Sequence, residues 1–128
     1  MPALNFKREF EAAILDGDKT QTVRKPRRDG RPPARRGDRL KIYTGMRTKS
    51  CRLIETVTVT SVDTVRIEAT QMWVNGRLLP AAIYSRDSEQ TDNEFAEADG
   101  FGSFMEMSKW FEETHGLPFD GVVIRWAL

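Results

Sequence analysis

The segment from Arg52 to Thr60 alternates apolar and polar residues, reading L-I-E-T-V-T-V-T from position 53 onward. An extended chain sends successive side chains to opposite faces, and β-branched residues are enriched in strands. The same β-rich pattern continues to Ile67. This segment is the clearest strand signal in the chain, and it predicts a protein in which strands dominate.

Four other segments have strand character. They are 20–24, which is rich in Thr and Val, 39–44, which follows a Gly-Asp turn, 72–79, and the apolar run 122–126. Within 72–79, Asn75 and Gly76 stand between apolar flanks, which is a strong β-hairpin signal.

Two segments have helical spacing, one at each end of the chain. Near the start, apolar residues between positions 4 and 14 predict a short amphipathic helix that ends at Gly17. Toward the end, Phe104, Met107 and Phe111 predict a helix from Ser103 to the His-Gly pair at 115–116. The expected core residues are Phe10, Ile14, Val57, Val59, Phe104, Met107, Phe111 and Val123.

The order of these elements predicts the fold class. About six short strands without a strand–helix–strand rhythm favour a mainly β fold with flanking helices (α+β), arranged as a small closed or nearly closed barrel. A barrel also removes exposed strand edges. At 128 residues, the chain is expected to form one domain, residues 1–128.

Positive charge is concentrated in one loop. The chain holds 20 Lys and Arg against 19 Asp and Glu, yet the arginines and lysine between positions 24 and 39 face only Asp29 and Asp38. Three prolines and two glycines between Pro26 and Gly37 exclude regular structure there. Such a loop is typical of an anion-binding segment, and phosphate matches the arginine fork. The alternative is a solvated loop without a specific ligand. The candidate nucleic-acid contacts are Arg24, Arg27, Arg28, Arg31, Arg35, Arg36 and, beyond the next strand, Arg47.

The chemistry of metals and cofactors has little support in the composition. Cys51 is the only cysteine and His115 the only histidine, so neither an internal disulfide nor a His/Cys zinc site is expected. We expect no metal and no cofactor. No apolar run approaches about 18 residues, and the first residues lack a signal-peptide core. These features predict a soluble, cytoplasmic protein without a membrane partner.

Two short motifs support a family resemblance. Gly17, Lys19, Thr20, Thr22 and Arg24 form G-x-K-T-x-T-x-R, and after the variable basic loop a G-D-x-L block begins at position 37. In this order the blocks resemble the ASCH domain, a relative of the PUA RNA-binding barrel. The late helix and the strand 122–126 also occur where that family has them. The resemblance covers nearly the whole chain, apart from an insertion around 73–90.

The resemblance implies a PUA-like barrel with a cleft, and RNA, single-stranded nucleic acid or modified nucleosides as partners. Some bacterial members are amidohydrolases that remove the acetyl group of N4-acetylcytidine with a lysine base, a threonine nucleophile and a carboxylic acid. By motif, the first two are Lys19 and Thr22. For the acid the chain offers Glu97 and Asp99, and Asp99, just before Gly100, is the preferred match.

Elementary chemistry sets conditions on this assignment. A threonine hydroxyl is a poor nucleophile until a base removes its proton, and lysine is a base only when its pKa falls well below about 10.4. Lys19 and Thr22 are three residues apart, so on one strand they would face opposite sides. Both reach one site only if Lys19 lies in the turn before the strand. Otherwise Lys19 is a phosphate or carbonyl ligand and Thr22 an ordinary strand residue.

Tyr43 and Lys49 form a second candidate site. An aromatic ring beside cations suits base stacking together with phosphate binding. A tyrosine and a lysine can also cleave RNA by acid–base chemistry with the 2′-hydroxyl as nucleophile. The alternative is a tyrosine that caps the core. Four functions therefore stay open: an RNA- or nucleoside-binding domain, an amidohydrolase, a ribonuclease, and a non-enzymatic protein-interaction module.

Overall fold

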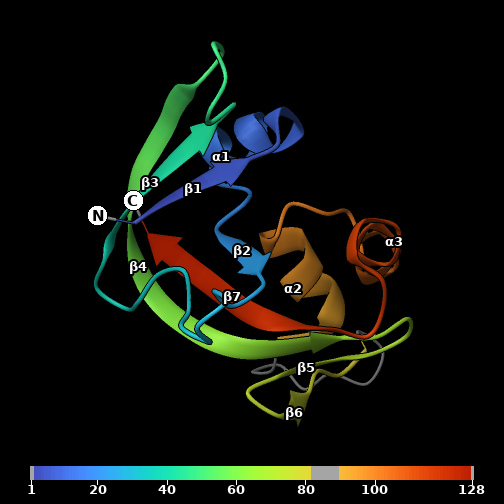
Figure 1. The fold of residues 1–128 in the computed structure, drawn as a ribbon. Helices are drawn as coiled ribbons and strands as arrows, with labels where there is room; N and C mark the ends of the chain where they lie inside the picture. Colours follow the sequence, from blue (N-terminus) through green and yellow to red (C-terminus); the bar gives the residue numbers. More distant parts are fainter. Residues whose placement is uncertain (1, 82–89, 128) are drawn as a thin grey trace.

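A computed structural model describes residues 2–81 and 90–127 of the chain. The protein is α+β and consists mostly of sheet (Figure 1). In chain order, its elements are β1 Ala3–Phe6, the 3-10 helix η1 Arg8–Phe10, α1 Glu11–Asp16, β2 Gln21–Arg24, β3 Arg39–Thr44, β4 Arg52–Ile67, β5 Met72–Val74, β6 Arg77–Leu78, α2 Asp92–Ala98, α3 Phe104–His115 and β7 Phe119–Ala127.

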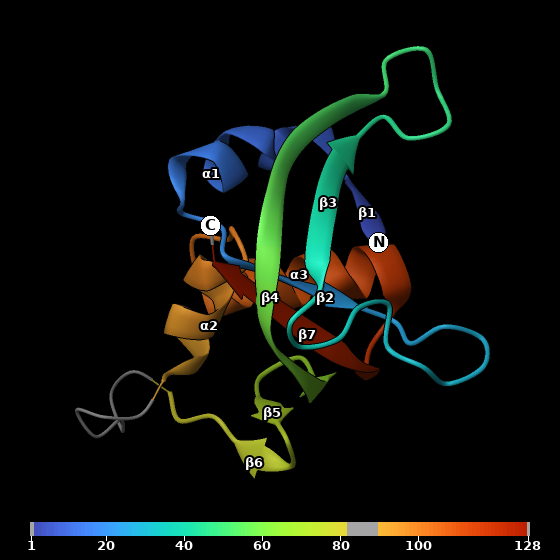
Figure 2. The same ribbon diagram turned by 90° about the vertical axis from the view of Figure 1, so that its left-hand side faces the viewer.

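The long strand β4 organises the sheet. Its first half pairs antiparallel with β3, and its second half pairs antiparallel with β7. The register of the β4–β7 ladder shifts between Val59 and Ser61. A bulge of this kind bends and twists a strand, and β4 curves strongly along its length in both views (Figures 1 and 2). The strand predicted from 52 to 67 is confirmed at both ends.

The sheet curls but does not close. Its pairings run β2–β7–β4–β3–β1, with β5 and β6 continuing from the end of β4, and β1 does not pair with β2. The closed barrel is therefore not confirmed. Among residues 2–81 and 90–127, one hydrogen bond joins β1 and β2 across this seam, from Arg24 Nη2 to the Asn5 carbonyl at 2.7 Å. All strand pairs are antiparallel except β1 with β3, which is parallel.

Two hydrophobic clusters cover the two faces of β7. Val123 belongs to the cluster that α2 and α3 complete with Phe95, Met107 and Phe111. The neighbouring residues of β7, among them Ile124, belong to a second cluster with residues of β1, α1, β3 and β4. Successive side chains of a strand face opposite sides, so β7 forms the wall between both cores. Every predicted core residue is buried except Phe10, which is half-buried.

The first predicted helix is wrong over its first half. Residues 3–6 form β1, which pairs parallel with β3 from Ala3↔Lys41 to Phe6↔Thr44. Only residues 11–16 form an α-helix, ended by Gly17 with a φ of 80°. Four residues carry too little periodicity to separate strand from helix, and the pairing with β3 decides. The predicted helix 103–115 is confirmed as α3, with Ser103 accepting the Glu106 amide at its start.

The two predicted turns follow expectation. Asn75 and Gly76 both have positive φ, 52° and 77°, as a two-residue hairpin requires. The basic loop between β2 and β3 contains no helix or strand and is anchored by Ala34, which is 3% exposed. The segment 85–99, predicted as a loop or weak helix, contains α2, and its residues 85–89 lie outside the described part. No described helix has the length and apolarity needed to cross a membrane.

Candidate active site

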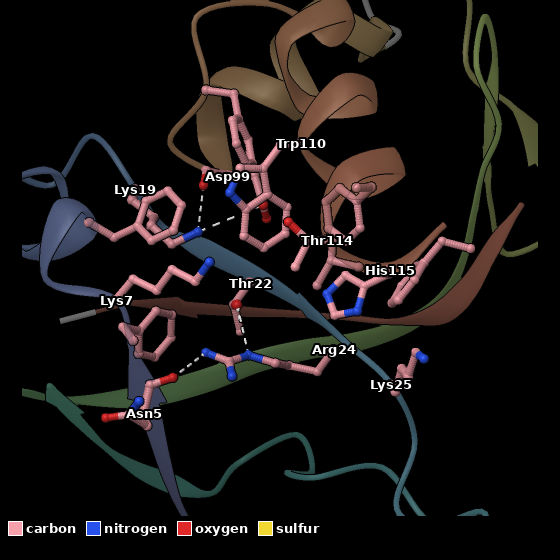
Figure 3. A pocket seen from close by; sticks show the side chains of 16 residues that line it. Asn5, Lys7, Lys19, Thr22, Arg24, Lys25, Asp99, Trp110, Thr114 and His115 are labelled. Atoms are coloured by element: carbon pink, nitrogen blue, oxygen red, sulfur yellow. Dashed lines mark hydrogen bonds and ion pairs between the residues drawn. The ribbon is translucent and has the colours of Figure 1, made fainter. Parts of the chain in front are cut away.

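A pocket that contains Lys19 and Thr22 lies at the open seam of the sheet. It has a volume of about 350 Å³ and is bounded by the β1 end, by β2, and by the segment from α2 to β7 (Figure 3). A pocket of this size accepts a small ligand. The residues that line it are Asn5, Phe6, Lys7, Phe10, Lys19, Thr22, Val23, Arg24, Lys25, Asp99, Phe101, Trp110, Phe111, Thr114, His115 and Phe119.

Lys19 enters the pocket from the turn between α1 and β2. Its backbone amide donates to the Ala13 carbonyl at 2.9 Å, and β2 begins two residues later. Lys19 therefore lies in the turn before the strand, which is the position that lets it reach the same site as Thr22. Both residues line this pocket. The Lys19 side chain is 3% exposed. Its Nζ donates to the Asp99 carbonyl and lies 3.7 Å from Asp99 Oδ2.

Asp99 is held at the end of α2, facing Lys19. It is the C-cap residue of the helix and is 3% exposed. Gln21 Nε2 donates to Asp99 Oδ1 at 3.2 Å. The next residue, Gly100, has a φ of 97°, and a Cβ there would lie 3.2 Å from Lys19 Cδ. A glycine therefore suits both the left-handed turn and the close approach of the Lys19 side chain.

Thr22 is positioned by Arg24, two residues along the same strand face. Arg24 Nε donates to Thr22 Oγ1 at 3.1 Å, and the guanidinium carbon lies 4.6 Å from the Phe6 ring centroid. The Thr22 hydroxyl accepts this bond, so its own hydrogen stays free to donate. A cation that donates to the hydroxyl oxygen stabilises negative charge on that oxygen. The Lys19 and Thr22 side chains do not hydrogen-bond each other.

Burial pushes the pKa values of Lys19 and Asp99 toward each other. Desolvation lowers the Lys19 pKa, which the Asp99 charge opposes and the Arg24 charge reinforces. Desolvation raises the Asp99 pKa, against the effects of Lys19, Gln21 and Arg24. Two aromatic rings lie near the Lys19 nitrogen, with the Phe10 centroid at 4.8 Å and the Phe6 centroid at 5.8 Å. The neutral forms, a free amine and a carboxylic acid, are thus favoured relative to water.

The outer wall of the pocket is aromatic. The half-buried Trp110 ring packs against Phe10 and Phe101, with centroids 6.3 Å and 5.7 Å away. Lys7 Nζ lies 5.0 Å from the Trp110 centroid. His115, at the end of α3, is exposed, and burial of part of the ring together with the charges of Lys25, Lys7 and Arg24 lowers its pKa.

The other predicted catalytic residues lie elsewhere. Tyr43 is half-buried on β3 and Lys49 is exposed in the turn that follows, and neither lines the pocket. Asn5, which pairs with Tyr43 between β1 and β3, does line the pocket. Its side-chain oxygen accepts a hydrogen bond from the Met46 backbone amide. Glu97 is exposed on α2 and is separate from Lys19. Of the two carboxylates considered, Asp99 is the one beside the lysine.

The candidate phosphate contacts divide into two groups. Arg24 lines the pocket, whereas the other arginines are exposed outside it. Arg31 pairs with Asp29 at 3.7 Å, and among the described residues the rest make no ion pair. These exposed residues are Arg27, Arg28, Arg31, Arg35, Arg36 and Arg47.

Sequence reasoning missed several residues of the site. Gln21, 1% exposed, also donates to the Phe95 carbonyl at 3.4 Å and so ties β2 to α2. The sequence does contain a signal for this role, since a glutamine between threonines in a short strand needs hydrogen-bond partners when it is buried. Lys7 and Trp110 carried no such signal. Residues 2–81 and 90–127 hold no group of three His, Cys, Asp or Glu side chains arranged for a metal ion.

No protein-family model, curated protein or solved structure matches this chain, so the function has to be argued from the pocket itself.

Proposed function

We propose that this protein is an ASCH-type, PUA-like domain that binds a modified nucleoside and hydrolyses its exocyclic amide. One observation carries the proposal: Lys19, Thr22 and Asp99 line a single pocket although the carboxylate is far away in the chain. A base, a hydroxyl nucleophile and an acid together can hydrolyse an amide through a covalent intermediate without a metal. We extend the proposal to a cytoplasmic location, because Cys51 is an exposed free thiol.

The surroundings of the pocket support a nucleoside as ligand. The half-buried faces of Phe10 and Trp110 form one wall, and stacking on an aromatic ring is a general way to hold a base. A curled, mostly antiparallel sheet with its open seam at the pocket is compatible with a PUA-like barrel.

The first chemical step is attack by Thr22. A neutral Lys19 amine takes the proton of the Thr22 hydroxyl, and the oxygen adds to the acyl carbon of the amide. Arg24 Nε, at 3.1 Å from Oγ1, stabilises the negative charge that forms on the Thr22 oxygen as its proton leaves. Lys19 must turn from the Asp99 carbonyl toward Thr22 for this step, a rearrangement that bound substrate or one bridging water would support.

The second step releases the amine. A protonated Asp99 donates its proton to the leaving nitrogen, the carbon–nitrogen bond breaks, and Thr22 carries the acyl group as an ester. Water, deprotonated by the Asp99 carboxylate, then attacks the ester, and the Lys19 ammonium returns its proton to the departing Thr22 oxygen, which restores the hydroxyl and both starting protonation states. Both starting protonation states are the ones that burial favours.

The direct test is to incubate the pure protein with N4-acetylcytidine and, separately, with unmodified RNA. We expect conversion of the nucleoside to cytidine and acetate, followed by chromatography, and intact RNA on a denaturing gel. Cleaved RNA with unchanged N4-acetylcytidine would favour a ribonuclease. If neither substrate changes at high protein concentration and long times, hydrolysis is excluded for both and a binding domain becomes the favoured reading.

RNA binding by the basic loop is a second candidate function. The loop exposes Arg27, Arg28, Arg35 and Arg36, which make no ion pair among the described residues. It begins directly after Lys25, which lines the pocket. Unpaired cations on a surface loop attract phosphates, and the released counterions make binding depend on salt. An acidic protein partner would be attracted by the same charges.

Exchanging four loop arginines should reveal which of these partners the loop serves. The variant replaces Arg27, Arg28, Arg35 and Arg36 by glutamine. If about four phosphates are neutralised, the slope of log affinity against log salt is near −0.7 for each in single strands, and the variant should flatten it. Filter binding with generic RNA measures this. Unchanged RNA affinity in the variant excludes the loop as an RNA site and leaves the protein-interaction module.

A further inference from the structure

The pocket holds an excess of positive charge, of which the chemistry above uses only Arg24. Lys19 and Asp99 compensate each other, either as an ion pair or as two neutral groups. The remaining charged residues of the lining are Lys7, Arg24 and Lys25, and Asp99 is the only carboxylate among all lining residues. None of these three cations forms an ion pair within the described part of the chain.

Arg24 is the most buried of these three cations. It is half-buried, and its two hydrogen bonds go to uncharged oxygens, those of Thr22 and of the Asn5 backbone. Desolvation lowers its pKa, which means that the site supplies less stabilisation for the charge than water does. A partly buried cation without a counterion costs free energy that a bound anion recovers.

Two flexible cations stand at the pocket mouth. Lys7 reaches in from the end of β1 and lies 5.0 Å from the Trp110 centroid, and Lys25 follows β2 on the other side (Figure 3). Both side chains are exposed at the rim. Thr114 and His115, at the end of α3, line the same mouth and make no side-chain hydrogen bond within the described residues. Hydroxyl, imidazole and ammonium groups are all donors to a phosphate.

We infer that the mouth between Lys7, Arg24 and Lys25 is a phosphate subsite, so the ligand of the pocket is a phosphorylated nucleoside. The nucleoside part of this inference rests on the proposed function, whereas the phosphate part rests on the three cations without ion-pair partners. A phosphomonoester of a free nucleotide and a phosphodiester of RNA share this chemistry. In either case the base would lie toward Trp110 and the phosphate at the mouth.

The test compares four probes by calorimetry, with Thr22→Val protein used to prevent turnover. They are N4-acetylcytidine, its 5′-monophosphate, a short RNA with one internal N4-acetylcytidine, and inorganic phosphate. We expect the 5′-monophosphate or the RNA to bind about tenfold tighter than the nucleoside, since hydrogen bonds to charged groups are strong. This advantage should shrink with added salt, whereas the affinity of the uncharged nucleoside should not.

Single substitutions locate the subsite. Lys7→Gln and Lys25→Gln should each reduce the monophosphate-to-nucleoside affinity ratio by several-fold, on the order of one charged hydrogen bond. The matched control is Arg77→Gln, which removes one cation from β6, outside the pocket, and should leave the ratio unchanged. All three side chains are exposed, so the variants are expected to fold.

The outcomes separate this inference from the proposed function. Equal binding of nucleoside and phosphorylated probes, or a ratio that survives both lysine substitutions, overturns the phosphate subsite even if N4-acetylcytidine is hydrolysed. An advantage confined to the RNA probe supports the subsite with a phosphodiester as its source. Binding of inorganic phosphate that depends on Lys7 and Lys25, without nucleoside binding, supports the subsite and overturns the nucleoside function. No binding of any probe overturns both.

Discussion

Replacing Thr22 by valine is expected to abolish hydrolysis of N4-acetylcytidine while leaving the fold intact. Valine has the shape of threonine but no hydroxyl, so the covalent route is lost. Loss of a nucleophile typically costs on the order of 10⁴-fold or more in kcat. Thr22→Ser keeps a hydroxyl within reach of Arg24 Nε and should retain turnover. The measurement is single-turnover conversion with each variant at saturating nucleoside.

A covalent intermediate provides an independent readout. With wild-type protein, acid quenching during turnover followed by peptide mass spectrometry should find an acetyl group on Thr22, and Thr22→Val should show none. If Thr22→Val hydrolyses the amide as fast as wild type, a threonine nucleophile is excluded. If RNA cleavage is found and is lost in Tyr43→Phe and Lys49→Ala but not in Thr22→Ala, the active site is the second candidate on β3 and its turn.

The Lys19–Asp99 pair is expected to lower the stability of the protein. Each group is almost fully buried, with side chains 3% and 5% exposed. Lys19→Met should reduce the free energy of unfolding by about 3–5 kcal/mol, because Asp99 stays buried without its partner. Adding Asp99→Asn should restore it and raise it above wild type by up to about 1–4 kcal/mol, since the cost of desolvating the two ionisable groups is then absent. Denaturant titration of wild type, both single variants and the double variant measures the cycle.

An exposed pair of equal length is the matched control. Arg31 Nε lies 3.7 Å from Asp29 Oδ2, the same separation as in the buried pair, but these side chains are 69% and 55% exposed. Arg31→Met should change stability by only about 0–1 kcal/mol, because water screens the pair. If the loss in free energy of unfolding for the double variant equals the sum of the losses for the two single variants, burial of the pair does not destabilise the protein.

The pH dependence has a definite sign. The Lys19 pKa is lowered in the folded protein, so the unfolded chain binds more protons just below the ordinary pKa of 10.5, and stability rises as pH approaches that value. The Asp99 pKa is raised above its ordinary 3.8, so its contribution is present below 3.8 and lost as pH rises through the folded value. The advantage of the double variant over wild type should therefore be largest between these limits.

Local patterns were enough to predict most of the fold. The alternation from Arg52 to Thr60, the hairpin residues Asn75 and Gly76, and the apolar positions of α3 are each patterns that can be recognised within a few residues of sequence. Short segments were different. Residues 3–6 have no distinctive period, and they form a strand because β3 lies beside them. The closure of the sheet was also beyond the sequence, since it depends on whether β1 meets β2 across the seam.

The sequence alone determined which residues could do the chemistry, and the tertiary structure decided which of them meet. The motif identified Lys19 and Thr22, but Asp99 joins them across 80 residues of chain, through the packing of α2 against β2. Tyr43, Lys49 and Glu97 lie outside this pocket. Burial, which moves the pKa values of Lys19 and Asp99, exists only after folding. Desolvation depends on neighbours in space, and a sequence specifies neighbours only along the chain.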